Sequence, residues 1–211
     1  MASKFDAVLW DFGGVILSSP FDAFNMYEKE LGLPAGFIRG LNTKNPDTNA
    51  WARFERSEIG PEEFCRAFEA EARAAGGELQ GERIIQCLSG DIRPQMVTAL
   101  TNVAGRYKTA CLTNNVKGTN RSAEKQAAID AVMTIFDEVV ESSKVGVRKP
   151  EPAFYVHACQ ALSIEPQRAV FLDDLGINLK PAREMGMATI KVGDPDLALE
   201  ELEALLGHSV R

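Results

Sequence analysis

Acidic, hydroxyl, amide and basic side chains stand at or soon after the ends of four apolar runs in this sequence. They are Asp11, Thr113-Asn114-Asn115, Lys149 and Asp173-Asp174. A carboxylate such as Asp11 can attack phosphorus and hold a covalent intermediate that water later opens, which splits one difficult step into two easier ones. A hard dication such as Mg²⁺ would relieve the repulsion among Asp11, Asp173 and Asp174. Because Lys149 could offset phosphoryl charge and Thr113 could donate a hydrogen bond, the set as a whole suits phosphoryl transfer.

The elements that must position these residues are strands of a parallel sheet. Residues 7–10 form an apolar run that ends at Asp11 and precedes Gly13-Gly14, a pattern typical of a strand buried on both faces. From Pro94 onward, helical and strand patterns alternate regularly, which indicates crossover helices. The further predicted strands are 107–112, 136–140, 169–172 and 188–192, and the predicted helices are 95–104, 117–134, 152–162, 175–185 and 195–206. Because functional groups collect beyond the carboxyl ends of parallel strands, the candidate residues should converge at one edge.

A helical insertion interrupts this alternation after the first strand. From residue 20 to residue 89 the apolar residues recur with helical spacing and no convincing strand appears. We therefore expect a core made of residues 1–19 and 90–211 and a helical cap made of residues 20–89. Aromatic residues at helical spacing are more often core than substrate contacts, so Trp51 and Phe54 are interpreted as packing of the cap.

Composition excludes several classes of protein. The 211 residues are 45% hydrophobic and 25% charged, as in ordinary globular proteins. The net charge of -7, without a cluster of Lys and Arg, argues against a nucleic-acid partner. The apolar runs are too short for a membrane span and the first residues lack the apolar core of a secretory signal, so we expect no membrane partner and a cytoplasmic protein. The oligomeric state is not readable from the sequence.

Four segments, in order, resemble the four motifs of the haloacid dehalogenase (HAD) superfamily. They are Asp11-Phe12-Gly13-Gly14-Val15, Leu112-Thr113-Asn114-Asn115, Gly146-Val147-Arg148-Lys149-Pro150-Glu151-Pro152 and the long run from Phe171 to Met187. The resemblance covers the whole chain. It implies an α/β fold with a Rossmann-like parallel five-stranded sheet of order 5-4-1-2-3 and an inserted helical cap. It also implies Mg²⁺ and hydrolysis of phosphate esters. We therefore expect a Mg²⁺-dependent phosphatase that acts on a small phosphorylated metabolite or a lipid phosphate through an aspartyl phosphate.

The same resemblance implies a role for each matching residue. Asp11 would be the nucleophile and a metal ligand, Lys149 and Thr113 would act in catalysis, and Asp174 would be the direct metal ligand with Asp173 as a secondary one. The phosphate would be bound by Thr113, Asn114, Lys149, Gly13 and Gly14, and the backbone carbonyl of Gly13 would reach the metal. On the residues alone, Asp173-Asp174 could instead cap a helix. The polar residues Arg148, Asn178, Lys180 and Arg183 are interpreted as solvent-facing.

Gly13 is the one departure from the pattern. Phosphatases of this superfamily usually carry an Asp there, whose side chain acts as general acid and base. Glycine keeps the backbone carbonyl but loses the proton donor, and such help is typically worth about 10²–10⁴-fold. Two alternatives therefore stay open. One is a 2-haloacid dehalogenase-type hydrolase, although a metal-free attack on carbon has no use for Asp173-Asp174. The other is a catalytically weak phosphate-binding module.

Overall fold

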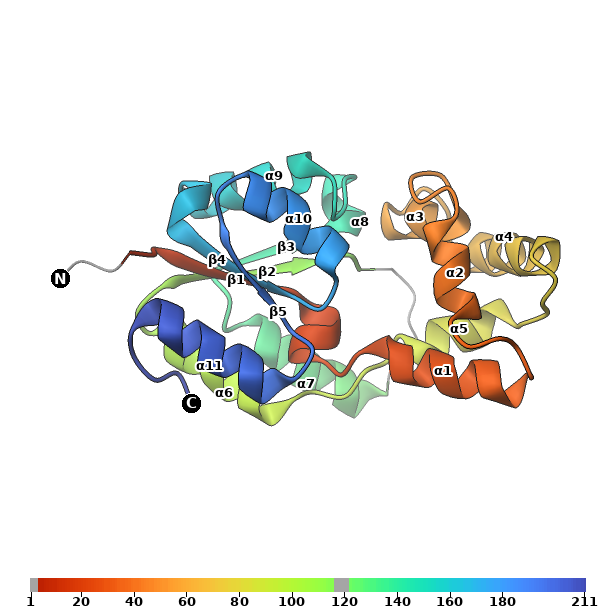
Figure 1. Cartoon of the computed structure of the whole chain (residues 1–211), viewed down its shortest axis with the longest axis horizontal. Coiled ribbons are helices and arrows are strands. Elements are labelled where there is room, and N and C mark those ends of the chain that lie inside the picture. The colour runs from red at the N-terminus through yellow and green to blue at the C-terminus, as the bar shows by residue number, and fades with distance from the viewer. Residues whose placement is uncertain (1–3, 116–121) are drawn as a thin grey trace.

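A five-stranded parallel sheet forms the centre of the molecule (Figure 1). The computed structural model describes residues 4–115 and 122–211. The strands are β1 (Ala7–Trp10), β2 (Lys108–Thr113), β3 (Glu138–Glu141), β4 (Ala169–Asp173) and β5 (Ala188–Lys191). Their order is β3-β2-β1-β4-β5 and every neighbouring pair is parallel. Read from the other edge this is 5-4-1-2-3, so the expected topology is confirmed.

Helices cover both faces of the sheet (Figure 1). One face carries α6 (Pro94–Ala104), α7 (Ala123–Met133) and α11 (Pro195–Leu206), and the other carries α9 (Pro152–Leu162) and α10 (Gly176–Glu184). Val8 and Trp10 pack into the first layer, while Ala7 and Leu9 pack into the second. Because successive strand residues point to opposite faces, β1 is buried on both sides, as its continuous apolar run predicted.

Most element boundaries agree with the sequence patterns to within one or two residues. Thr113 and Asp173 are the last residues of β2 and β4, although the patterns placed them just after the strands. The short helix α8 (Ser142–Val145) follows β3 and was not predicted. The helix expected at 117–134 is observed as α7 from Ala123, and its predicted start at 117–121 lies outside the described residues.

Five α-helices lie between β1 and α6, at the end of the sheet toward which the carboxyl ends of the strands point (Figure 1). They are α1 (Pro20–Glu30), α2 (Phe37–Thr43), α3 (Ala50–Glu55), α4 (Pro61–Ala74) and α5 (Gly81–Cys87). We call residues 20–89 the insertion. It has its own hydrophobic cluster, in which Phe54 and Phe64 stack at 4.4 Å and Trp51 packs edge-on against Phe64. This separate cluster agrees with the division into a core and a cap, which stays a prediction.

The two linkers to the insertion run side by side. Leu17 and Ile92 form an antiparallel bridge, and the Ser18 amide donates to the Asp91 carbonyl at 2.8 Å. Arg93, on the returning linker, donates from Nη1 to the Gly14 carbonyl at 2.6 Å. The base of the insertion is therefore tied to the turn that follows β1.

No helix within the described ranges is long and apolar enough to cross a membrane.

Candidate active site

Asp11 lies at the carboxyl end of β1, and its side chain is fixed by the local backbone. Its amide donates to the Leu172 carbonyl at 2.8 Å, which extends the pairing of β1 with β4 by one bond. The chain then makes one wide turn, closed by the Leu17 amide donating to the Phe12 carbonyl at 2.8 Å. The Phe12 amide donates to Asp11 Oδ1 at 2.6 Å. Oδ2 of Asp11 has no hydrogen-bond partner within residues 4–115 and 122–211, so it is the oxygen left for a ligand.

Lys149 joins two of the strand ends. Its side chain is only 1% exposed, and Nζ lies 2.8 Å from Asp11 Oδ1 and 2.7 Å from Asp173 Oδ2. Burial lowers the pKa of Lys149, but the two carboxylates outweigh burial and raise that pKa, so the ammonium stays charged. Burial also raises the pKa of Asp11 well above its ordinary value, although Lys149 opposes this. The site therefore holds a buried lysine between two carboxylates.

Asp173 is held by protein donors on both oxygens. Oδ1 accepts from the Leu175 amide at 2.8 Å, and Oδ2 accepts from Lys149. Asn178 Nδ2 lies 3.0 and 3.1 Å from the two oxygens. Asn178 is buried, so its interpretation as solvent-facing is wrong. The side chain lies in the first turn of α10 and reaches back to the strand end. Lys180 and Arg183 of the same helix are exposed, as expected.

Asp174 accepts fewer side-chain hydrogen bonds than Asp173, the other member of the acidic pair. Its Oδ2 accepts from Ser19 Oγ at 3.3 Å. Burial, followed by the charge of Asp173, raises the pKa of Asp174 to about 6. One carboxylate oxygen from each of Asp11, Asp173 and Asp174 lies within 4.8 Å of the others. Three carboxylates facing one lysine leave uncompensated negative charge, so this donor set fits a hard dication such as Mg²⁺. Asp174 is better placed than Asp173 to give it an oxygen, because Asp173 is already saturated by donors.

The glycine pair brings the turn close to the acidic group. Gly14 has φ +76°, and a Cβ at this position would lie 2.1 Å from Asp174 Oδ2. Glycine is therefore required at Gly14, both for its backbone angle and for the space. Gly13 is different, because its φ is -71° and an added Cβ would meet nothing within 4 Å. A side chain would fit at Gly13.

Thr113 is the last residue of β2, and Asn114, which follows it, contacts Lys149. Thr113 is buried at the end of β2, and its hydroxyl has no hydrogen-bond partner in the described part of the chain. Asn114 Oδ1 accepts from the Lys149 amide and Nδ2 donates to the Lys149 carbonyl, both at 2.9 Å. Asn114 therefore clamps the backbone of Lys149, a contact that the sequence did not indicate.

Two residues at this edge were not recognised from the sequence. Glu55 comes from α3 of the insertion, is buried, and accepts from Arg148 Nη1. The Arg148 side chain is only 12% exposed, so its interpretation as solvent-facing is wrong. Glu55 and Arg148 are 93 positions apart. Local patterns carry no signal for such a pair.

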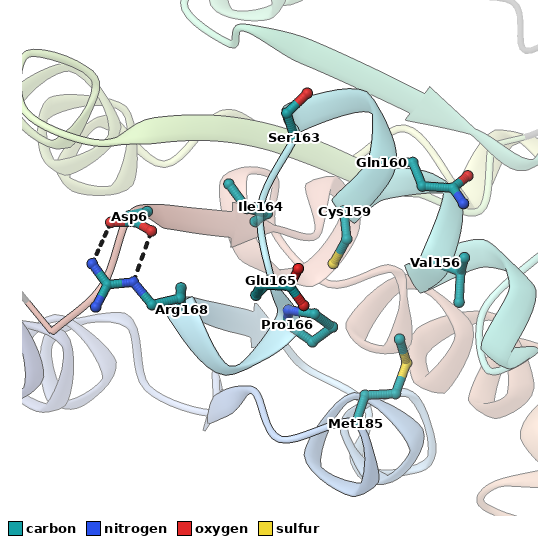
Figure 2. Close-up of a pocket in the computed structure, with 10 residues that line it drawn as sticks. All are labelled: Asp6, Val156, Cys159, Gln160, Ser163, Ile164, Glu165, Pro166, Arg168 and Met185. Carbon is teal, nitrogen blue, oxygen red and sulfur yellow. Dashed lines mark hydrogen bonds and ion pairs between the residues drawn. The ribbon is translucent and has the colours of Figure 1, made fainter.

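A separate open pocket lies at the opposite edge of the sheet (Figure 2). Asp6 and Arg168, which immediately precede β1 and β4, form an ion pair on its wall with Arg168 Nε 2.7 Å from Asp6 Oδ2. None of the residues predicted to act in the site lines this pocket. The candidate site is therefore the edge where Asp11, Thr113, Lys149 and Asp173 meet.

Comparison with known proteins identifies relatives. Residues 5–186 match the family model described as haloacid dehalogenase-like hydrolase. The chain is 35% identical to acyl-CoA dehydrogenase family member 10 of Mus musculus (97% of this chain, 19% of that protein) and 33% identical to bifunctional epoxide hydrolase 2 of Sus scrofa (95% and 39%). It thus spans less than half the length of either. It is also 24% identical to the sesquiterpene phosphatase astK of Aspergillus oryzae, over 98% of this chain and 100% of that protein.

A solved structure has the same fold. A HAD family enzyme of Bacteroides thetaiotaomicron, in complex with magnesium and inorganic phosphate, aligns with a TM-score of 0.58 and 21% identity, over 90% of this chain and 96% of that chain. At this identity the likeness concerns the fold, and it agrees with the sheet order and with the helices on both faces.

Proposed function

Because the chain belongs to the haloacid dehalogenase-like hydrolase family, we propose that it is a Mg²⁺-dependent phosphatase acting through an aspartyl phosphate on Asp11. The observation that carries the proposal is the group of three carboxylates within 4.8 Å of one another, of which the two buried ones are joined by Lys149. The phosphatase astK, which aligns over its whole length, supports it. The substrate would be a small phosphorylated metabolite or a lipid phosphate, and the net charge of -7 disfavours nucleic acid.

Mg²⁺ would be held by Asp11, Asp174 and the backbone carbonyl of Gly13, with Asp173 as a secondary residue. When bound, it would supply positive charge against the carboxylates and the phosphoryl oxygens. Because Lys149 and Asn178 already occupy the oxygens of Asp173, that residue would act by orienting Lys149.

The protein residues would perform two displacements. An oxygen of Asp11 attacks phosphorus, a new oxygen–phosphorus bond forms, and the ester bond to the leaving oxygen breaks. The Thr113 hydroxyl and the backbone amide of Asn114 donate hydrogen bonds to the phosphoryl group, while Lys149 offsets its charge. Water then attacks the same phosphorus, which releases inorganic phosphate and restores Asp11. Because Gly13 has no side chain, the leaving oxygen takes its proton from solvent.

Replacing Gly14 with alanine is expected to weaken Mg²⁺ binding. The left-handed backbone would cost about 1–2 kcal/mol in an alanine, and the new Cβ would displace the Asp174 carboxylate. Calorimetric titration with Mg²⁺ measures the loss, which we expect to reach about tenfold in affinity or more. Gly36→Ala is the matched control, since Gly36 has φ +79° and open space around it. If both variants bind Mg²⁺ as the wild type does, Asp174 is not a metal ligand.

Replacing Gly13 with aspartate is expected to raise the rate on poor leaving groups. The position has an ordinary φ and room for a side chain, so the carboxyl group can be added without strain. A proton donor helps an alkyl phosphate more than p-nitrophenyl phosphate, and the gain should approach about 10²-fold on the former. Comparing kcat for the two esters in both proteins measures it. Equal or negative effects on both esters would show that the missing acid does not limit turnover.

The function is tested by hydrolysis of p-nitrophenyl phosphate with Mg²⁺ and with EDTA, beside chloride release from 2-chloropropionate. Metal-dependent phosphate release without chloride release is the expected result. Chloride release without phosphatase activity would assign a dehalogenase instead. If neither product forms while Mg²⁺ and orthophosphate still bind, the protein is a phosphate-binding module.

A further inference from the structure

Glu55 is a buried carboxylate of the insertion that the reaction outlined above does not use. It accepts hydrogen bonds from Trp51 Nε1 at 3.0 Å and from Asn114 Nδ2 at 3.3 Å, and it pairs with Arg148 Nη1. Trp51 belongs to the same helix α3, whereas Asn114 and Arg148 belong to the two loops that carry the candidate site. A buried carboxylate is costly unless it is paired and hydrogen-bonded, so this one is held to the site loops by its own charge.

Only two residues, Asn114 and Lys149, separate Glu55 from the reacting carboxylate. Asn114, which donates to Glu55, also makes both backbone hydrogen bonds to Lys149. Arg148, the other partner, is the residue before Lys149 in the chain. The Lys149 ammonium in turn touches Asp11 and Asp173. A shift of Glu55 would therefore move the backbone from which Lys149 reaches Asp11.

The end of α3 is where the insertion rests on these loops (Figure 1). The Ser142 hydroxyl, at the start of α8, donates to the Glu55 carbonyl at 2.6 Å. Arg148 Nη2 donates to the Pro46 carbonyl at 2.8 Å, and Arg56 Nη1 lies 3.5 Å from Glu151 Oε1. Glu55 and Ser142 are the buried polar residues of this contact region, and Glu55 contacts both site loops.

We propose that Glu55 is a positioning residue, through which the insertion holds Asn114 and Arg148 so that Lys149 bridges Asp11 and Asp173. The proposal rests on the proposed phosphatase function, because its main readout is phosphoryl transfer. It assigns the insertion a part in assembling the catalytic group. The carboxylate acts through its neighbours and does not touch the phosphoryl group.

The first test compares Glu55→Gln with Glu63→Gln on p-nitrophenyl phosphate. A glutamine has one acceptor oxygen and no charge, so it cannot accept from Trp51, Asn114 and Arg148 together. Glu63 is a half-exposed glutamate of the same insertion, paired with Arg53 at 3.0 Å. For Glu55→Gln we expect kcat to fall about tenfold and the Ki of orthovanadate, which mimics the transition state, to rise by about the same factor. Glu63→Gln should change both by less than about twofold.

Orthovanadate separates positioning from a loss of folded protein. A smaller folded fraction lowers kcat but leaves the Ki of the remaining enzyme unchanged, so a fall in kcat with an unchanged Ki would overturn the proposal. Unchanged values of both would also overturn it. If Glu55→Gln does not fold, Arg148→Met removes the same pair from the other side, and the same two readouts decide.

A second measurement does not depend on activity. Lys149 is almost fully buried, so acetic anhydride should label it slowly in the wild type. In Glu55→Gln we expect severalfold faster labelling of Lys149, read by peptide mass spectrometry, with the exposed Lys180 as internal reference. Equal labelling rates would contradict the proposal. Should the wild type neither hydrolyse phosphate esters nor bind orthovanadate, the phosphatase function fails, and the labelling result alone decides whether Glu55 positions Lys149.

Discussion

Replacing Asp11 with asparagine is expected to lower the rate of phosphate release by at least about 10³-fold, because the amide cannot attack phosphorus. The measurement is kcat for p-nitrophenyl phosphate with saturating Mg²⁺. Asp6→Asn is the matched control, since Asp6 lies at the other end of β1, is half-exposed and pairs with Arg168. If Asp11→Asn keeps about a tenth of the wild-type rate, Asp11 is not the nucleophile.

The loss of activity in Asp11→Asn should come without a loss of stability at neutral pH. Burial raises the pKa of Asp11, so above its unfolded pKa the ionised carboxylate destabilises the metal-free folded state relative to the unfolded one. Asp11→Asn should therefore have the same free energy of unfolding as the wild type at pH 7, or a higher one. This difference in free energy should shrink as the pH falls, because wild-type Asp11 then becomes protonated. Urea unfolding with EDTA at several pH values measures this.

Replacing Lys149 with methionine is expected to have the largest effect on stability. Methionine fills much of the space but leaves Asp11 and Asp173 facing each other without a cation. Removing one partner from a buried ion pair typically costs about 3–5 kcal/mol, and losing a donor to a developing charge lowers kcat by about 10²–10³-fold. Urea unfolding and steady-state kinetics measure the two effects.

The cause of the destabilisation can be isolated. Lys180→Met changes an exposed lysine and should leave the free energy of unfolding within about 0.5 kcal/mol of the wild type. Adding Asp173→Asn to Lys149→Met removes one of the two uncompensated charges and should restore part of the lost stability. A loss of less than about 1 kcal/mol in Lys149→Met would contradict the ion-pair arrangement.

The sheet and much of the candidate site were predictable because their signals are local. The apolar run before Asp11 and the one before Asp173 each mark a buried strand, and the parallel arrangement then brings both strand ends to one edge. The glycine pair after the first strand is also a local signal, since it marks a turn. That turn leaves no room for a Cβ at Gly14 beside Asp174. Neighbouring residues in the chain therefore specified where these groups would be.

The contacts that hold the site together were not predictable in the same way. Asn178 is polar, like most solvent-facing residues of a helix. Only the packing of α10 against β4 turns its amide toward Asp173. Glu55 and Arg148 meet only because the insertion rests on the loop before Lys149. Such pairs depend on tertiary packing, since charge and helical periodicity do not say which residue across the molecule will be the partner.

In the proposed reaction, Asp11 carries the phosphoryl group during turnover. The direct measurement is peptide mass spectrometry of enzyme that is quenched in acid while it hydrolyses p-nitrophenyl phosphate with Mg²⁺. We predict that the peptide containing Asp11 carries the added mass of one phosphoryl group. We also predict that borohydride reduces the acyl phosphate at Asp11 and changes the mass of no other residue. Phosphate release with Asp11 unmodified, or with the phosphoryl group on another side chain, would show that Asp11 is not the nucleophile.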